Sequence, residues 1–229
     1  IVPPDGYFKK IYDVCKKNQI IFIADEVVTG FGRLGHFFSS EEIFGVVPDI
    51  ITCAKGITSG YLPLGAVLFS NKLIADLKDD SSLFFHGYTY SGHPACCAAA
   101  LKNIEILKRD KILEHVKEIE PYFFEKLNSL YELPIVGDIR GKGLMAGIEC
   151  VINKDSKEAL VLDKAIGSRI DEESIKLGLI IRPLYHICVL SPALIINKEQ
   201  INELTEKLYQ AISNTIDQLK NEGLWSQTK

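Results

Sequence analysis

The chain has 229 residues and a mass of 25.6 kDa, with 47% hydrophobic residues, 24% charged residues and a formal net charge of −4. This composition is typical of a globular protein with one large or two modest domains. The mildly acidic balance contains no block of like charge, which argues against binding to nucleic acid or to an anionic membrane. No apolar run approaches the roughly 20 residues that cross a bilayer. We therefore expect small molecules or other protein chains as partners.

Six cysteines and five histidines are present, without a Cys-x-x-Cys pair or a spacing typical of zinc ligands. The sequence therefore predicts no metal site and no disulfide framework, and a cytoplasmic protein with reduced thiols. The only methionine is Met145, and the chain opens at Ile1 with neither an initiator nor the basic segment of a signal peptide. We expect the sequence to be the carboxy-terminal part of a longer protein.

The first predicted elements are a helix followed by a buried strand. Apolar residues recur at helical spacing from Asp5 to Lys17, and Asn18 ends that helix. Residues 20–24 form a short, continuous apolar run, which is typical of a strand covered on both faces in a parallel sheet. Asp25 and Glu26 stand at the carboxyl end of this strand.

A second apolar run, residues 50–54, stops at Lys55, and a glycine-rich turn leads to a third run at 66–69. Strands and helices at these lengths predict an α/β sheet. Ligands of such sheets bind beyond the carboxyl ends of the parallel strands, where Asp25 and Lys55 are both expected.

The composition changes after the next helix, which starts at Pro94 and ends near Lys108. Beyond it we expect a helix over 112–130 with a break or kink at Pro121. Short strands and helices then alternate, which predicts an α+β unit with a boundary near Arg109. The strands are expected at 135–136, 144–151 and 179–182, and the helices at 159–177 and 198–219.

Lys55 and Asp25 are the residues whose chemistry stands out. A lysine held in an apolar pocket can be neutral and nucleophilic, as condensation with a carbonyl requires. The alternative is a lysine that extends from a strand end into solvent. Asp25 would need a cationic partner, such as a lysine, a protonated ring nitrogen or a metal ion. An apolar strand ending in Asp-Glu is also typical of a magnesium-dependent nucleotidase, although the chain has no GxxxxGK[ST] loop.

Two further segments carry polar groups suited to anions. The block from His86 to Pro94 combines hydroxyls, glycines and a helix start, which suits a phosphate group. Its alternative is a capped turn with surface tyrosines. Arg182 ends the run Gly-Leu-Ile-Ile, where its guanidinium could bind a carboxylate with two hydrogen bonds or simply face solvent.

Taken together, these residues resemble the class III pyridoxal-phosphate-dependent aminotransferases, most closely the ω-amino acid:pyruvate type. The resemblance covers nearly the whole chain and follows the family's order. Its blocks are VPPDGYFKKIYDVC, IIFIADEVVTGFGRLG, GVVPDIITCAKGITSGYLPLGAV, HGYTYSGHPACCAAALKNIEIL, VGDIRGKGLMAGIE and LIIRPL. The resemblance implies a type I fold: residues 1–108 are the C-terminal part of the large cofactor domain, with a mostly parallel sheet, and residues 109–229 are the small α+β C-terminal domain.

The resemblance also assigns roles at matching motif positions. Lys55 would bind pyridoxal 5'-phosphate covalently and then move the proton in catalysis. Asp25 would pair with the ring nitrogen of the cofactor, and Val27 would pack on one face of the ring. Thr89 would reach the cofactor phosphate of a neighbouring subunit, which implies a homodimer with shared active sites. Arg182 would bind the carboxylate of the substrate.

The implied reaction is a ping-pong transfer of an amino group from an ω-amino acid or amine to pyruvate or a similar keto acid. The chain departs from the family at Tyr185, where glycine is usual, and at Pro192-Ala193, where Pro-Pro is usual. The family's other half supplies a phosphate loop and a ring-stacking aromatic, so a catalytically silent piece is one alternative. Ornithine, 4-aminobutyrate and diaminopelargonate aminotransferases are alternatives within the family.

Overall fold

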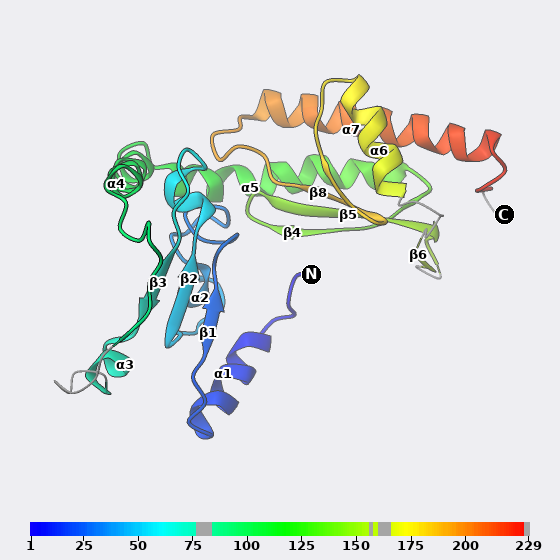
Figure 1. Cartoon of the computed structure of the whole chain (residues 1–229). Coiled ribbons are helices and arrows are strands. Elements are labelled where there is room, and N and C mark those ends of the chain that lie inside the picture. The colour runs from blue at the N-terminus through cyan, green and yellow to red at the C-terminus, as the bar shows by residue number, and fades with distance from the viewer. Residues whose placement is uncertain (77–83, 156–157, 160–165, 227–229) are drawn as a thin grey trace. The chain divides into compact units, whose positions relative to one another are not determined.

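The computed structural model describes residues 1–76, 84–155, 158–159 and 166–226 (Figure 1). It divides into two compact units, one of residues 3–115 and the other of residues 116–229 together with Ile1 and Val2. The division falls in the first turn of helix α5 (Ile112–Asn128). Both units mix helices and strands, so the predicted α/β class is confirmed.

The unit of residues 3–115 is built around a three-stranded sheet of order β1-β2-β3, formed by β1 (Ile23–Asp25), β2 (Ile50–Cys53) and β3 (Ala66–Phe69). Strands β1 and β2 are parallel and β2 and β3 are antiparallel. The unit's helices are α1 (Tyr7–Lys17), α2 (Ser39–Glu42), α3 (Asn71–Asp76) and α4 (Pro94–Arg109), with the 3-10 turn η1 (Lys55–Thr58) after β2.

Helix α1 ends at Asn18 as predicted, and an ion pair ties it to the chain just before β2. The Lys16 ammonium lies 2.8 Å from Asp49, and the Phe22 amide donates to the same carboxylate at 2.9 Å. The hydrogen bonds from Lys16 and Phe22 outweigh burial and lower the pKa of Asp49. This carboxylate therefore fixes the start of both parallel strands.

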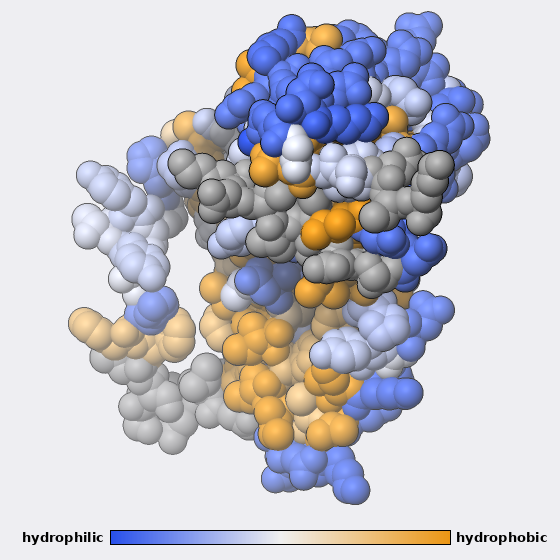
Figure 2. Space-filling model, turned by 90° about the vertical axis from the view of Figure 1, so that its right-hand side faces the viewer, coloured by the Kyte–Doolittle hydropathy of each residue, from blue (hydrophilic) through white to orange (hydrophobic). Residues whose placement is uncertain are grey.

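The expectation that residues 20–24 are covered on both faces is wrong for this structure. Ile21 is 52% exposed and Ile23 is 57% exposed. Figure 2 shows that hydrophobic residues also gather at the surface of the face that it draws. Strand β1 is an edge strand of the described sheet, so one flank and one face lack a covering element among the described residues. Phe22 points the other way and its ring meets Tyr12 of α1 at 5.6 Å between centroids.

The second unit packs helices on an antiparallel sheet of order β4-β5-β8-β7, with β6 (Glu158–Ala159) beside β5. The other strands are β4 (Val136–Lys142), β5 (Met145–Asn153), β7 (Arg182–Leu184) and β8 (Ile187–Leu190). The turn η2 (Ser129–Glu132) precedes β4, and the helices are α5, α6 (Ile166–Lys176) and α7 (Lys198–Asn221). Figure 1 shows these three helices on one face of the sheet.

The helices of this unit are held by their apolar faces. Phe123 and Leu127 of α5 and Leu208 and Ile212 of α7 are fully buried in the core. The predicted break at Pro121 does not occur, because α5 continues through this exposed proline and its buried residues lie on both sides of it. The helix predicted over 159–177 begins at Ile166 in the described residues, and residues 160–165 lie outside them. No helix among the described residues is long and apolar enough to cross a membrane.

Candidate active site

The parallel pairing of β1 and β2 places Asp25 and Lys55 at one edge of the sheet. Asp25 is the last residue of β1 and pairs with Thr52, and Lys55 follows β2 by two residues. The amide of Glu26 donates to the carbonyl of Thr52 at 2.8 Å, so the pairing extends to the end of both strands. A carboxylate and a primary amine therefore occupy the ligand-binding edge that the strand order predicts.

Of the two environments that the sequence left open for Lys55, an apolar pocket and a strand end that faces solvent, the structure shows the second. Strand β2 ends at Cys53 and the chain then turns, so Lys55 is exposed and begins the 3-10 turn η1. Its φ is +45° and that of Ser59 is +50°, and both are left-handed conformations that L residues adopt at a cost. Such strained residues persist only where the surroundings hold them.

Close packing at Gly56 holds the turn of Lys55 against the loop that follows Asp25. A Cβ on Gly56 would lie 2.9 Å from the Cβ of Phe31 and 3.0 Å from the carbonyl oxygen of Gly30. Both distances are shorter than ordinary van der Waals contact, so only glycine fits. The two segments that carry the carboxylate and the amine are thereby packed directly on each other.

Lys55 lines a hollow of about 700 Å³ together with Thr58 and the glycine-rich segment after it. The Thr58 hydroxyl donates to the carbonyl of Leu62 at 2.6 Å and closes this loop. The remaining lining residues are Gly60, Tyr61, Leu62, Pro63, Leu64 and Gly65. The hollow is large enough for a small organic molecule within reach of a primary amine.

Glu26 is a charged group buried in this region, and its sequence position alone did not reveal its structural role. It is 2% exposed. The hydroxyls of Thr29 and Ser39 donate to Oε2 at 2.5 and 2.6 Å, and the amide and hydroxyl of Ser40 donate to Oε1 at 2.7 and 2.5 Å. Burial raises the pKa of Glu26, but the hydrogen bonds from Ser39, Ser40 and Thr29 outweigh it, and the net pKa is lowered.

The network around Glu26 fixes the loop that carries Val27. Glu26 is followed by a turn in which the Gly30 amide donates to the Glu26 carbonyl at 2.9 Å. The amide of Val27 donates to Oδ1 of Asp25 at 3.0 Å and so orients the carboxylate at the sheet edge. In the sequence, the only sign that Glu26 would be held in this way is the pair of hydroxyl residues Ser39 and Ser40, and such pairs are too common to be informative.

Thr89 lies in a different segment, the exposed turn that precedes α4. The Ser91 amide donates to the carbonyl of Tyr88 at 2.9 Å, and the Tyr88 amide donates to the Ser91 hydroxyl at 2.9 Å. Pro94 is the first residue of α4, as predicted. The strand pairing puts Asp25 and Lys55 at one edge of the sheet, and Val27 follows Asp25 by two residues, whereas Thr89 is exposed on this separate turn.

Arg182 belongs to the second unit, where it is the first residue of β7 and pairs with Val189. It is exposed, and its hairpin is tied to α6 by a hydrogen bond of 2.9 Å from the Gly167 amide to the carbonyl of Tyr185. The φ of Tyr185 is +54°. This turn therefore needs a left-handed residue, which explains physically why glycine is usual there.

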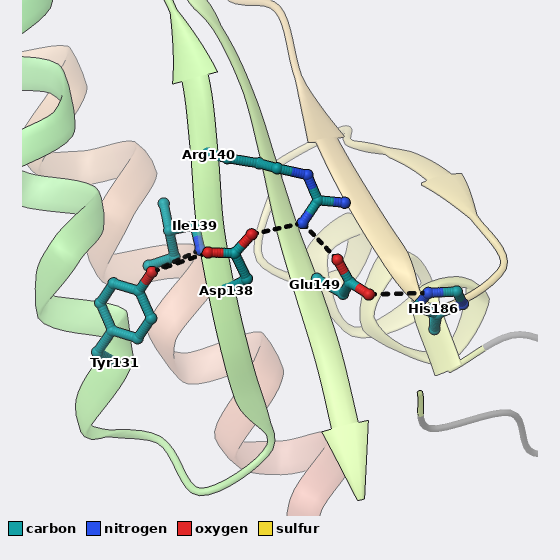
Figure 3. A network of polar contacts seen from close by, with 6 residues as sticks. All are labelled: Tyr131, Asp138, Ile139, Arg140, Glu149 and His186. Carbon is teal, nitrogen blue, oxygen red and sulfur yellow. Dashed lines mark hydrogen bonds and ion pairs between the residues drawn. The ribbon is translucent and has the colours of Figure 1, made fainter. Parts of the chain in front are cut away.

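A network of ion pairs on the neighbouring strands reaches the β7–β8 turn of this hairpin at His186 (Figure 3). The Arg140 guanidinium contacts Asp138 at 2.7 Å and also Glu149 on the neighbouring strand. The second oxygen of Glu149 lies 3.3 Å from Nε2 of His186 in the β7–β8 turn. Burial lowers the pKa of Arg140, but the hydrogen bonds to Asp138 and Glu149 outweigh it and raise the net value. The network explains the polar residues of the VGDIRGKGLMAGIE block, to which the sequence analysis gave no role.

Comparison with known proteins shows the family to which the chain belongs. The sequence model of the class III aminotransferases matches residues 1–212. The chain belongs to the class III aminotransferase family. It is 42% identical over 216 residues to the putrescine–pyruvate aminotransferase of Pseudomonas aeruginosa, across 94% of this chain and 47% of that protein. It is 39% identical to the γ-aminobutyrate transaminase 3 of Solanum lycopersicum, across 97% of this chain and 44% of that protein.

Solved structures of the class III transaminases show the same fold. An (S)-enantioselective ω-transaminase from Thermomicrobium roseum matches 95% of this chain and 48% of its own, with a TM-score of 0.88 and 41% identity. An amine transaminase from an uncultivated Pseudomonas species, solved in its PLP-bound form, matches 94% of this chain and 49% of its own, with a TM-score of 0.89 and 37% identity. The chain spans about half the length of the relatives that it matches. This membership gives no support to the magnesium-nucleotidase alternative.

Proposed function

We propose that the protein is a pyridoxal-phosphate-dependent transaminase in which Lys55 and Asp25 hold the cofactor. The observation that carries this proposal is the pairing of β1 with β2, which puts the Asp25 carboxylate and the Lys55 amine at one edge of the sheet. The donor set fits the group: a primary amine can bind an aldehyde carbon, and a carboxylate can balance a protonated pyridine nitrogen. The PLP-bound relative supports the same cofactor for this chain.

When bound, pyridoxal phosphate would supply an aldehyde and a ring that accepts electrons from the substrate. Lys55 Nζ would hold the cofactor covalently and, once released, take up and return a proton. The Asp25 carboxylate would keep the ring nitrogen protonated, and Val27 would pack on one ring face. Thr89 would bind the cofactor phosphate of a partner subunit in a homodimer, and Arg182 would bind a substrate carboxylate.

We propose a ping-pong transfer from an ω-amino acid or amine to pyruvate or a similar keto acid, in the cytoplasm. The relative from Pseudomonas aeruginosa, named for putrescine and pyruvate, supports this choice of donor and acceptor. A piece that binds cofactor weakly and transfers no amino group is the second candidate, because the chain spans half the length of its relatives.

Transfer of ¹⁵N from labelled putrescine or 4-aminobutyrate to pyruvate, detected as ¹⁵N-alanine, tests the function. The wild-type protein should form alanine only with added pyridoxal phosphate, and Lys55→Arg should abolish transfer. Lys72→Arg, in α3, is the matched control and should retain transfer. Asp25→Asn should lose transfer far more than it loses cofactor binding. Alanine formed equally by Lys55→Arg would refute the assignment, and binding of the cofactor without transfer would support the silent alternative.

A further inference from the structure

The turn that carries Lys55 is held by one side chain from a distant helix. Asn103, in the middle of α4, donates from Nδ2 to the carbonyl of Gly56 at 2.9 Å and to that of Ile57 at 3.1 Å. Its Oδ1 accepts from the hydroxyl of Ser59 at 2.6 Å. The side-chain amide of Asn103 therefore joins three residues of the turn that begins at Lys55, namely Gly56, Ile57 and Ser59.

These hydrogen bonds meet a specific need of the turn. The Gly56 carbonyl already accepts from the Ser59 amide at 3.1 Å, so Asn103 adds a second donor there and supplies one to the carbonyl of Ile57. The turn also contains two left-handed residues, Lys55 and Ser59, whose conformations are costly unless neighbours fix them. Asn103 supplies donors to the carbonyls and an acceptor to the hydroxyl, and no charged side chain could supply both.

The orientation of the Asn103 amide follows from its partners. Two carbonyl oxygens face one end of the amide, so this end must be the NH₂ group. The hydroxyl of Ser59 can then donate to the opposite oxygen. All three hydrogen bonds are consistent with a single orientation, and an aspartate, which offers only acceptors, could keep only the bond from the Ser59 hydroxyl.

We propose that Asn103 is a positioning residue that sets the backbone of the Lys55 turn and thereby the position of the Lys55 amine at the sheet edge that it shares with Asp25. This inference rests on the proposed role of Lys55. It makes no use of a contact between Asn103 and the cofactor. Asn103 acts through the carbonyls of Gly56 and Ile57, the two residues directly after the lysine.

The test compares Asn103→Ala and Asn103→Asp in the full chain. An aspartate fills the same volume as Asn103 but replaces its two donated hydrogen bonds with repulsion between oxygens. If Asn103 only filled space, Asn103→Asp would therefore behave like the wild type. If Asn103 positions the turn, both variants should lose label on Lys55 and protection from exchange to a similar extent. Asn202→Ala is the matched control, because Asn202 accepts one side-chain hydrogen bond from Tyr122 in the other unit. Ser59→Ala, which loses one bond of three, should have an intermediate effect.

The first readout is the yield of pyridoxyl label on Lys55 relative to Lys72, after incubation with pyridoxal phosphate and cyanoborohydride. The ratio should fall about tenfold in both Asn103 variants and stay unchanged in Asn202→Ala. The second readout is amide exchange in the peptide covering residues 55–60, which should quicken about tenfold in both variants. An unchanged ratio, or unchanged exchange in Asn103→Asp, overturns the inference.

The two proposals fail in different ways. If the pyridoxyl label on the wild-type protein shows no preference for Lys55 over Lys72, the proposed function fails. Amide hydrogen exchange in residues 55–60 then still reports whether Asn103 holds the turn. If wild-type label favours Lys55 and Asn103→Asp does not change it, the function stands and the positioning role fails. Should Asn103→Ala not fold, Ser59→Ala decides, and a wild-type ratio in that variant counts against the inference.

Discussion

Replacement of Gly56 by alanine tests the packing that joins the Lys55 turn to the loop after Asp25. The new Cβ would lie 2.9 Å from the Cβ of Phe31 and 3.0 Å from the carbonyl of Gly30. Neither atom can move freely, because the carbonyl is backbone and Phe31 is 6% exposed with its ring 5.6 Å from that of Phe38. One segment must therefore shift by a few tenths of an ångström or more. Overpacking of this kind costs about 1–3 kcal/mol.

Peptide-resolved hydrogen exchange is the suitable assay, because the single tryptophan, Trp225, lies in the other unit. Gly56→Ala should lower the opening free energy of the peptide covering residues 55–60 by about 1–3 kcal/mol. Gly87→Ala is the control, since its nearest atom beyond its chain neighbours is the Ser91 hydroxyl at 3.9 Å. Its effect should stay within about 0.5 kcal/mol. If the two variants behave alike, the close packing described at Gly56 is wrong.

Three other changes probe the surroundings of the site. Glu26→Gln should destabilise the first unit by about 1–3 kcal/mol in neutral solution, because an amide cannot accept all four hydrogen bonds. The pKa of Glu26 is below its ordinary value of 4.5, so its contribution to stability is present above that value and is lost as the pH falls through the lowered folded-state pKa. Acid titration of exchange in the first unit should therefore be flatter in Glu26→Gln, and an equal slope would contradict the network. Tyr185→Gly should stabilise the second unit by about 0.5–1 kcal/mol by relieving its positive φ, while Tyr185→Ala keeps the strain. Urea unfolding followed by Trp225 fluorescence measures both variants, and equal midpoints would refute the strain argument. Asn197→Ala removes the capping box of α7 and should cost about 1 kcal/mol in the same assay, where Asn202→Ala gives the comparison.

Local patterns in the sequence predicted the elements that place the site. The end of α1 at Asn18, the strand at 50–53 and the start of α4 at Pro94 follow from periodicity, capping and proline chemistry, which act within a few residues. The common edge of Asp25 and Lys55 then followed from the rule that parallel strands share one carboxyl end.

Features that depend on contacts between distant residues were missed. Glu26 is held by the distant Ser39 and Ser40 as well as by Thr29, and the Lys55 turn is held by the packing at Gly56 and by Asn103, 47 residues beyond Gly56. Strand β8 is four residues long and is defined by its pairing with β5 and β7. The sequence left an apolar pocket and a solvent-facing strand end open for Lys55, and the choice depends on where the chain turns: it turns before the lysine, which is exposed. None of these contacts leaves a periodic signal.

Mapping of the pyridoxyl label identifies the lysine that binds the cofactor. The full chain is incubated with pyridoxal phosphate, reduced with borohydride, digested and analysed by mass spectrometry. Our account predicts that the label is concentrated on Lys55 and that Asp25→Asn weakens binding less than it weakens amino transfer. A label concentrated on any other lysine, or spread evenly over the exposed lysines, would contradict the assignment of Lys55 as the cofactor-binding residue.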